Sequence, residues 1–450
     1  MKYIALSDHE IKEMLRTIGV SKLEDLFNSI LDRIKLKGNL SLPGPLTESE
    51  LIQYFKNLAS KNNFNGYISF LGAGAYPHLI PYLVDYLSAR GEFLTLYTPY
   101  QPELSQGTLQ SIFEFQSLIC QLTGMDVANA SLYDGSTSLA EAALMAYRIK
   151  KRSKILISRT VHPEYRQVAK TYFKNLDLEL IEIDYLESGE SNIDQIKDKI
   201  DDQVAAVLIQ SPNFFGIIEK IDQISEIAHN EGALMIVAVA EPLTLALLKS
   251  PGELGADIVT GEAQSFGLPL SFGGPYLGFL ACQSEFVRQM PGRIVGQTKD
   301  LEGQRGFVLT LSTREQHIRR ERATSNICTN QAWCALRATI FLEVMGKEGL
   351  KELAWHNLQK ANYAKKSLDK TDKVKIKFSG TIFNEFVVKF PQSVQKVNSR
   401  LREKGIIGGL DLEKFYPELK NCSLFCVTEV HKKEHIDKLV DSLKLIADNK

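Results

Sequence analysis

Short apolar runs alternate with helix-like stretches through the middle of the chain. Four runs rich in aliphatic and β-branched residues are typical of buried strands: 154–158, 178–184, 204–210 and 234–239. Two further apolar segments lie at 257–260 and 276–282, and helical spacing appears between runs, for example at 163–175 and 222–230. Strands that are apolar on both faces and alternate with helices predict a mostly parallel sheet covered on both sides. We therefore expect a large α/β domain over residues 66–330.

The pattern changes at both ends of the chain. Residues 1–65 hold three short helix candidates, each opened by a hydroxyl side chain with glutamate three positions later: Ser7 and Glu10, Ser21 and Glu24, Thr47 and Glu50. Helices this short bury too little surface alone, so we expect an N-terminal helical arm that packs on something larger. A long helix from 331 to 345, a strand pair at 374–379 and 382–390, and a strand at 423–428 between helices predict a smaller α+β domain over residues 331–450.

Composition narrows the class of protein. The 450 residues carry 53 Lys and Arg against 54 Asp and Glu, which argues against a general nucleic-acid binder. The longest apolar run, 232–248, is interrupted by Glu241 and Pro242, so we expect no membrane span. Six cysteines are too sparse for a disulfide scaffold, and the N-terminus lacks the apolar segment of a secretory signal. A cytoplasmic protein is expected.

Two weak motifs are interpreted as structural. The stretch from Gly72 to Pro77 begins like a dinucleotide-binding fingerprint, but proline replaces the third glycine, so we expect a turn with close backbone approaches. His431 and His435 have the spacing of two metal ligands on a helix, yet charged neighbours and the lack of a third ligand predict a solvated face and no metal.

Three segments carry candidate chemistry. Ser136, Thr137 and Ser138 stand at the start of a helix, where they would form either an anion cup or, through Ser138 and Glu141, a capping box. The segment from Tyr97 to Glu103 holds two tyrosines and two prolines, which predicts a stiff loop that either packs on the surface or walls a site or interface. The third segment is a cluster of four arginines: Arg314, Arg319, Arg320 and Arg322. They would bind an anion or a partner, or form an internal ion-pair network around Glu315, His317 and Glu321.

Longer motifs carry a family resemblance. They are Tyr-Thr-Pro-Tyr-Gln at 97–101, Gln-Gly-x-Leu-Gln at 106–110, Ala-Asn-Ala-Ser at 128–131, Thr-Arg-Glu-Gln-His-Ile at 313–318 and Ala-Thr-Ser-Asn-Ile-Cys-Thr-Asn at 323–330. In these motifs the chain resembles the glycine decarboxylase P-protein of the glycine cleavage system, and more narrowly subunit 1, the α subunit, of its two-subunit bacterial form. The resemblance implies the fold-type I architecture of pyridoxal-phosphate enzymes.

The segment that would carry the cofactor lysine differs from the corresponding segment in the lysine-bearing half of that family. There a His-Lys pair precedes a short segment ending in proline and a glycine-rich run. Counting back from Pro269 places Gln264 at the lysine position and Ala263 at the histidine position, and no lysine occurs between 255 and 274. A glutamine amide cannot form an imine. The acid expected to pair with the pyridine nitrogen is also altered, because Glu241 is the nearest candidate.

The resemblance therefore implies a lysine-free subunit of a heteromeric glycine dehydrogenase. Pyridoxal phosphate would be held by a lysine-bearing subunit 2 in an α2β2 assembly, and the aminomethyl group left from glycine would pass to the lipoyl H-protein, with the T- and L-proteins acting downstream. Ser136 to Ser138 would be the relic of a phosphate cup. Five residues are candidates to reach the partner's site: Tyr97, Tyr100, Gln101, Glu103 and Gln106. Two alternatives remain open, a purely structural scaffold and a self-sufficient enzyme with a relocated lysine such as Lys249 or Lys299.

Overall fold

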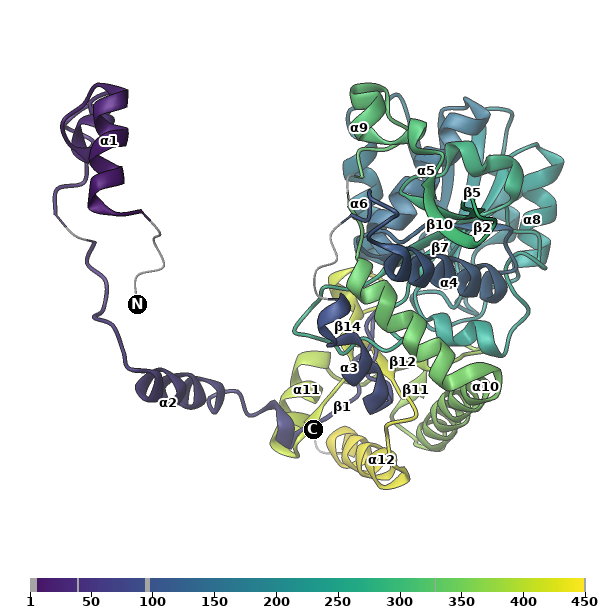
Figure 1. The fold of residues 1–450 in the computed structure, drawn as a ribbon. Coiled ribbons are helices and arrows are strands. Elements are labelled where there is room, and N and C mark those ends of the chain that lie inside the picture. The colour runs from purple at the N-terminus through teal and green to yellow at the C-terminus, as the bar shows by residue number, and fades with distance from the viewer. Residues whose placement is uncertain (1–5, 39, 94–97, 328, 449–450) are drawn as a thin grey trace. The chain divides into compact units, whose positions relative to one another are not determined.

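The structure is a computed structural model, and it describes residues 6–38, 40–93, 98–327 and 329–448 (Figure 1). The chain divides into two compact units, residues 1–65 and residues 66–450. The expected division of the second unit near residue 331 stays a prediction.

The first unit consists of short helices with almost no core. Helix α1 (Asp8–Ile18) and helix α2 (Glu48–Ala59) begin with the predicted capping boxes at Ser7 and Thr47. The third predicted box, Ser21 with Glu24, is wrong: the Ser21 hydroxyl donates to Asp25 at 2.9 Å, beside a 3₁₀ helix over Leu23–Phe27. Leu15 is the one buried residue among the described side chains of this unit, so its apolar faces lack the cover that short helices need.

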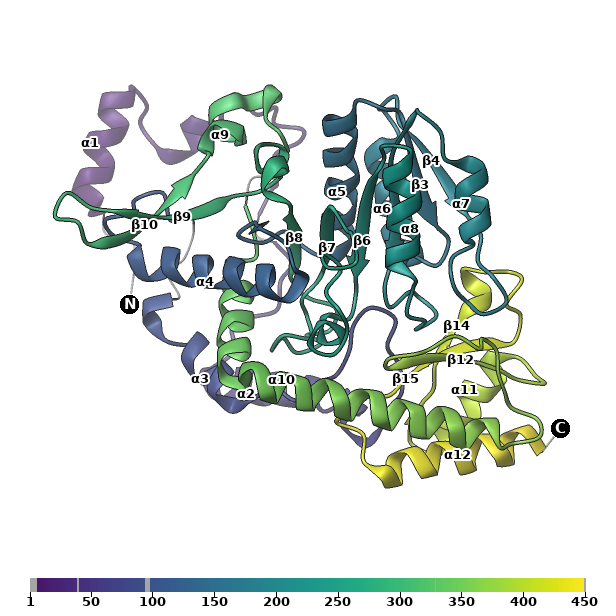
Figure 2. The same ribbon diagram turned by 90° about the vertical axis from the view of Figure 1, so that its right-hand side faces the viewer.

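The second unit is built on a seven-stranded sheet with strand order β2-β8-β7-β6-β5-β3-β4. The labels of β8, β7, β6, β3 and β4 follow this order from left to right in Figure 2. Five neighbouring strands are parallel, as expected from the buried runs: β7 (Ile258–Glu262), β6 (Leu234–Val239), β5 (Val204–Gln210), β3 (Lys154–Ser158) and β4 (Glu179–Ile183). The remaining two, β8 (Gly278–Cys282) and β2 (Val127–Ala128), are antiparallel to their neighbours.

Helices cover both faces of this sheet because its strands are apolar on both sides. Along β5, Ala206 and Leu208 pack with α5 (Gly135–Lys150) and α6 (Pro163–Phe173). Val207 and Ile209 of the same strand pack in the opposite core. That core receives α4 (Gln106–Thr123), α7 (Ile193–Lys199), α8 (Ile221–Asn230) and the first part of α10 (Ala332–Asp369).

A second, smaller sheet lies near the C-terminus with order β11-β12-β15-β14. Its strands are β11 (Lys375–Ile376), β12 (Glu385–Lys389), β15 (Cys422–Cys426) and β14 (Leu410–Asp411), all antiparallel to their neighbours, and it shares a core with α11 (Val394–Glu403) and α12 (Lys433–Asp448). Helix α10 is longer than expected and has a break at Gly346, where φ is 58°. Figure 2 shows α10 running from beside α4 to beside α12.

Four connecting elements were not expected from the sequence. Strand β1 (Ile68–Ser69) pairs with β13 (Ile406–Ile407), so the start of this unit joins the C-terminal part. Helix α3 (Tyr82–Ser88) packs on α10. Strands β9 (Ile294–Lys299) and β10 (Arg305–Thr310) form a hairpin that packs on α4. Within the described residues, no helix combines the length and the apolar character needed to cross a membrane.

Candidate functional site

Gln264 lies at the edge of the large sheet where the parallel strands end. Strand β7 stops at Glu262, and Gln264 follows in the loop with only 2% of its surface exposed. Its amide oxygen accepts from the backbone N–H of Tyr76 at 2.9 Å, and its amide nitrogen donates to the carbonyl of Tyr76 at 3.1 Å and of Leu268 at 2.7 Å. A lysine could donate at this position but could not accept from the Tyr76 N–H. The glutamine therefore clamps the segment that contains Tyr76 to the sheet edge.

Tyr76 continues this network into the smaller sheet. Its hydroxyl donates to Glu385 at 2.8 Å, and the other oxygen of Glu385 accepts from the Ala73 N–H at 2.6 Å. Burial raises the pKa of Glu385 to about 7. Gly72 approaches so closely that a Cβ there would lie 2.5 Å from Glu385, which fits the predicted close turn.

Glu241, the candidate pyridine partner, is occupied by another buried group. Its carboxylate accepts from His78 at 2.9 Å and from Asn384 at 2.9 Å, and the second ring nitrogen of His78 lies 2.9 Å from Glu429. Burial would lower the pKa of His78, but Glu241 and Glu429 outweigh it and raise that pKa to about 10. Glu241 is thus the counter-ion of an imidazolium that belongs to this chain.

The N-terminus of α5, where an anion cup was considered, is closed by two carboxylates. Asp134 accepts from the Thr137 N–H at 2.8 Å and from the Ser136 hydroxyl at 2.6 Å, and Glu262 accepts from the Gly135 N–H at 3.0 Å. Burial raises the pKa of Glu262 to about 7. The predicted capping box of Ser138 and Glu141 is wrong: the cap is Asp134 with Thr137, because α5 begins one turn earlier than expected. The Ser138 hydroxyl packs against β8, where a Cβ on Gly278 would lie 2.4 Å away.

An aromatic side chain fills the space next to this helix end. The Tyr165 ring stacks on His162 with centroids 4.7 Å apart, and a Cβ on Gly135 would lie 2.4 Å from the Tyr165 hydroxyl. Burial lowers the pKa of His162. Tyr165, Asp134 and Glu262 occupy the helix end where a phosphate would bind, and Gln264 at the strand end cannot form an imine. This set of residues therefore does not fit pyridoxal phosphate bound as an imine.

The predicted loop residues lie elsewhere, beside the β9–β10 hairpin. Tyr97 lies outside the described residues. Tyr100 is 49% exposed, and its hydroxyl accepts from Arg293 at 3.1 Å. Gln101 and Glu103 are exposed. Gln106 is used within the chain, because its amide bonds to both the N–H and the carbonyl of Phe307 at 2.9 Å.

The arginine cluster separates into a structural residue and an exposed group. Arg314 is buried, and its guanidinium donates to the carbonyls of Met290, Gly292 and Leu311. Arg319, Arg320 and Arg322 are exposed. Glu315 lies 3.4 Å from Arg293 and 3.6 Å from His317, so it pairs with an arginine outside the predicted cluster.

The remaining predicted positions differ in burial. Lys249 and Lys299, the candidate relocated lysines, are exposed. The prediction of a solvated helix face is wrong for His431: it precedes α12, is buried and donates from Nε2 to the Ser69 carbonyl at 2.7 Å. Its ring stacks on Phe70.

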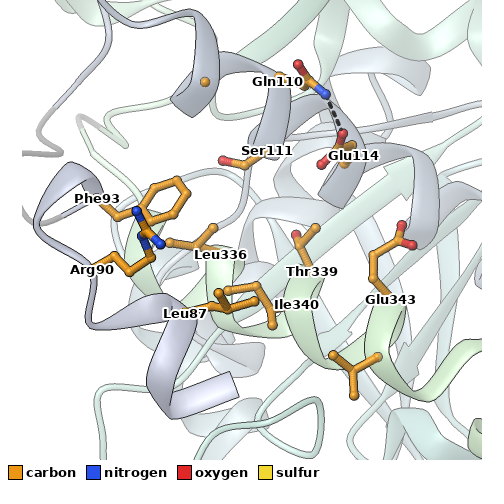
Figure 3. Close-up of a pocket in the computed structure, with 12 residues that line it drawn as sticks. Leu87, Arg90, Phe93, Gln110, Ser111, Glu114, Leu336, Thr339, Ile340 and Glu343 are labelled. Atoms are coloured by element: carbon orange, nitrogen blue, oxygen red, sulfur yellow. Dashed lines mark hydrogen bonds between the residues drawn. The ribbon is translucent and has the colours of Figure 1, made fainter. Parts of the chain in front are cut away.

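A cavity of about 630 Å³ lies between α3, α4 and α10 (Figure 3). Leu87, Phe93, Leu336 and Ile340 give it an apolar lining, and Arg90, Glu114 and Glu343 carry the charges. Figure 3 shows the Gln110 amide directed at Glu114, to which it donates at 2.8 Å. Phe93 and Gly107, which both line the cavity, flank the segment that holds the five residues expected to reach a partner's site. We call this segment, residues 94–106, the wall segment.

The comparisons with known proteins decide the family. The sequence profile described as glycine cleavage system P-protein matches residues 1–443. The chain belongs to the P-protein family. Within that family it is 54% identical over 441 residues to a protein of Desulfitobacterium hafniense and 51% identical over 446 residues to one of Brevibacillus brevis. These alignments cover 98% and 99% of both chains, and both relatives are named probable glycine dehydrogenase (decarboxylating) subunit 1.

Solved structures confirm the expected fold class. A crystal structure of glycine decarboxylase (P-protein) of the glycine cleavage system in inhibitor-bound form has a TM-score of 0.90 at 41% identity, covering 99% of this chain and 100% of that one. A sphingosine-1-phosphate lyase of Burkholderia pseudomallei has a TM-score of 0.66 at 15% identity, covering 92% and 93%, and shows the fold alone. The P-protein chain described here is therefore a fold-type I α/β protein with a small C-terminal sheet domain.

Sequence reasoning missed most of the residues that close the strand edge. Tyr76, His78, Tyr165 and Glu385 come from segments far apart in the chain, and no local motif marks them. Glu262 alone had a signal, because it is an acid at the end of a buried strand, two residues before Gln264.

Proposed function

We propose that this chain is subunit 1 of a heteromeric glycine dehydrogenase (decarboxylating) of the glycine cleavage system. Glycine is decarboxylated on pyridoxal phosphate that a lysine-bearing subunit 2 holds, and the aminomethyl group passes to the lipoyl H-protein before the T- and L-proteins act. The chain has no cofactor of its own and is inactive when isolated. We also propose an α2β2 assembly in the cytoplasm, in which the α/β pair replaces the homodimer usual for the fold.

The observation that carries the proposal is the position of Gln264. It stands where the family's lysine is expected, and both ends of its amide are bonded to the backbone of Tyr76. An amide cannot capture an aldehyde, and both N–H donors of this one are taken up by the carbonyls of Tyr76 and Leu268. The nearby carboxylates and Tyr165 support the same conclusion, because they occupy the helix end that would bind a phosphate.

The same proposal assigns the partner to the face around Tyr100 and the cavity of Figure 3. Tyr82, Tyr86 and Trp333 are large side chains exposed near this cavity by 80%, 58% and 41%. Apolar surface of this kind marks a binding face in soluble proteins. Since the cavity is bracketed by the ends of the wall segment, we propose that subunit 2 covers both together.

Reconstitution tests the division of labour. The purified chain is incubated with pyridoxal phosphate and reduced with borohydride, alone and together with subunit 2. We expect no lysine adduct on this chain in either sample, one adduct per subunit 2, and exchange of bicarbonate into glycine only in the complex with H-protein. A stoichiometric adduct on this chain, or exchange by the chain alone, would overturn the proposal and favour a relocated lysine.

Substitutions in the wall segment separate a catalytic wall from a scaffold. Tyr100→Phe and Glu103→Gln are expected to lower glycine exchange while the complex still assembles on a sizing column. Gln121→Glu on α4 serves as a control for a surface amide outside the segment. Unchanged exchange in both wall variants would show that the chain acts only as a scaffold.

A further inference from the structure

The hydroxyl of Tyr100 is held by a buried arginine from a distant part of the chain. Arg293 precedes β9 and is 7% exposed, and its Nη2 donates to the Tyr100 hydroxyl at 3.1 Å. The centre of the guanidinium also lies 5.5 Å from the centroid of the Tyr100 ring. Arginine suits such a contact, because its planar fork can direct one N–H at an oxygen while its plane lies near an aromatic ring.

Two further side chains complete the setting of Tyr100. Glu315 has a side chain that is 9% exposed, and its carboxylate lies 3.4 Å from Arg293 Nε, which fixes the guanidinium from the other side. His317 lies 3.6 Å from Glu315 and meets the Tyr100 ring edge-on, with centroids 5.4 Å apart. Together the four residues border a cavity of about 220 Å³.

The loop that carries Tyr100 is fastened at its other end to the same hairpin. Gln106 bonds to the backbone of Phe307 in β10, and its amide nitrogen also donates to the Pro102 carbonyl at 2.8 Å. Residues 98–106 are thus anchored before β9 through Arg293 and on β10 through Gln106. A side chain that is half exposed and held at its polar tip is locked in one orientation, so the exposed part of its ring has a fixed position.

We infer that Arg293, backed by Glu315 and His317, is a positioning residue that fixes the direction of Tyr100 toward the partner's active site. This inference rests on the proposed function, which makes Tyr100 part of the wall of that site. It assigns Gln106 to the anchoring of the loop and not to contact with the partner. Arg293 acts through the Tyr100 hydroxyl and touches no reacting atom in this assignment.

The test combines a spectroscopic readout with a double-mutant cycle in the reconstituted complex. 3-Fluorotyrosine is placed at position 100, and its fluorine resonance is recorded for the wild type, for Arg293→Lys and for the matched control Arg319→Lys, whose arginine is exposed on the neighbouring segment. We expect one shifted, narrow resonance in the wild type and the control. In Arg293→Lys it should move toward the value of free fluorotyrosine. An unmoved resonance in Arg293→Lys would overturn the inference whatever the activity.

Glycine exchange then shows whether the positioning matters for the reaction. We expect Arg293→Lys to lower exchange about tenfold through kcat with little change in KM, and to have an effect below about threefold when Tyr100 is already phenylalanine. Equal effects of Arg293→Lys in both backgrounds would overturn the inference while leaving Tyr100 in the wall. No effect of Tyr100→Phe itself would remove both the assigned role of Tyr100 and the inference.

Discussion

Replacement of Gln264 by methionine gives the sharpest test of the clamp at the strand edge. The two side chains have similar length and volume, but methionine makes none of the three hydrogen bonds that the amide makes to Tyr76 and Leu268. Two of these bonds attach the Tyr76 segment, and the third, to Leu268, lies within the loop of Gln264 itself. At about 1 kcal/mol net for each bond, loss of the two should weaken the attachment of the segment by about 2 kcal/mol. That free energy corresponds to an opening equilibrium about 30-fold larger.

Hydrogen–deuterium exchange measures this opening directly. Peptides that contain Tyr76 should exchange about 30-fold faster in Gln264→Met than in the wild type, because the Tyr76 N–H loses its acceptor and the segment opens more often. Gln203→Met is the matched control, since Gln203 is exposed in the turn before β5. Exchange within about threefold of the wild type would refute the reasoning, because it would show that the amide contributes little to holding the segment.

Three further outcomes follow from the same geometry. Gln264→Lys alone should yield no borohydride-stable adduct with pyridoxal phosphate by intact mass, since Tyr165, Asp134 and Glu262 still close the helix end; a full adduct would contradict this account of the edge. The pKa of His78 is raised from 6.5 to about 10, so its stabilising charge is complete below pH 6.5 and is lost as the pH rises toward 10. The urea midpoint of the wild type should therefore fall across that range more steeply than the midpoint of His78→Gln, and parallel curves would rule this linkage out. Val344→Glu, at a cavity-lining position that is 39% exposed, should weaken binding to subunit 2 at least about tenfold by placing a charge in an apolar contact. Val430→Glu, at a 42% exposed position on the smaller domain, should not weaken binding, and equal affinities of the two variants would place the interface elsewhere.

The two carboxylates with raised pKa values have a related effect on the closed edge. Glu262 and Glu385 both have pKa values of about 7 because they are buried. A raised carboxyl pKa means that the folded chain holds its proton more tightly than the unfolded chain does. Their contribution to stability is therefore complete below about pH 4.5 and declines as the pH rises toward 7. Glu262 and Glu385 therefore differ from a carboxylate in a salt bridge, whose contribution to stability is lost on acidification.

Local patterns in the sequence determined the elements of the large domain. The runs at 154–158, 204–210 and 234–239 became strands with these same bounds, because a strand buried on both faces is a continuous apolar run that needs no distant information. The capping boxes at Ser7 and Thr47 were equally local. The proposal that Gln264 stands at the position of the cofactor lysine also came from the sequence, since it depends on spacing from Pro269 within one loop.

Tertiary structure decided what those residues do. The sequence placed Glu241 near a cofactor position, but only the fold brings His78 from 163 positions away to pair with it. Gln106 was expected to reach a partner, and only the fold shows that its amide bonds to β10, which is 201 positions distant. The reason is physical: a side chain's partners depend on which segments the packed sheets bring together, and such contacts leave no periodicity or spacing to read along the chain.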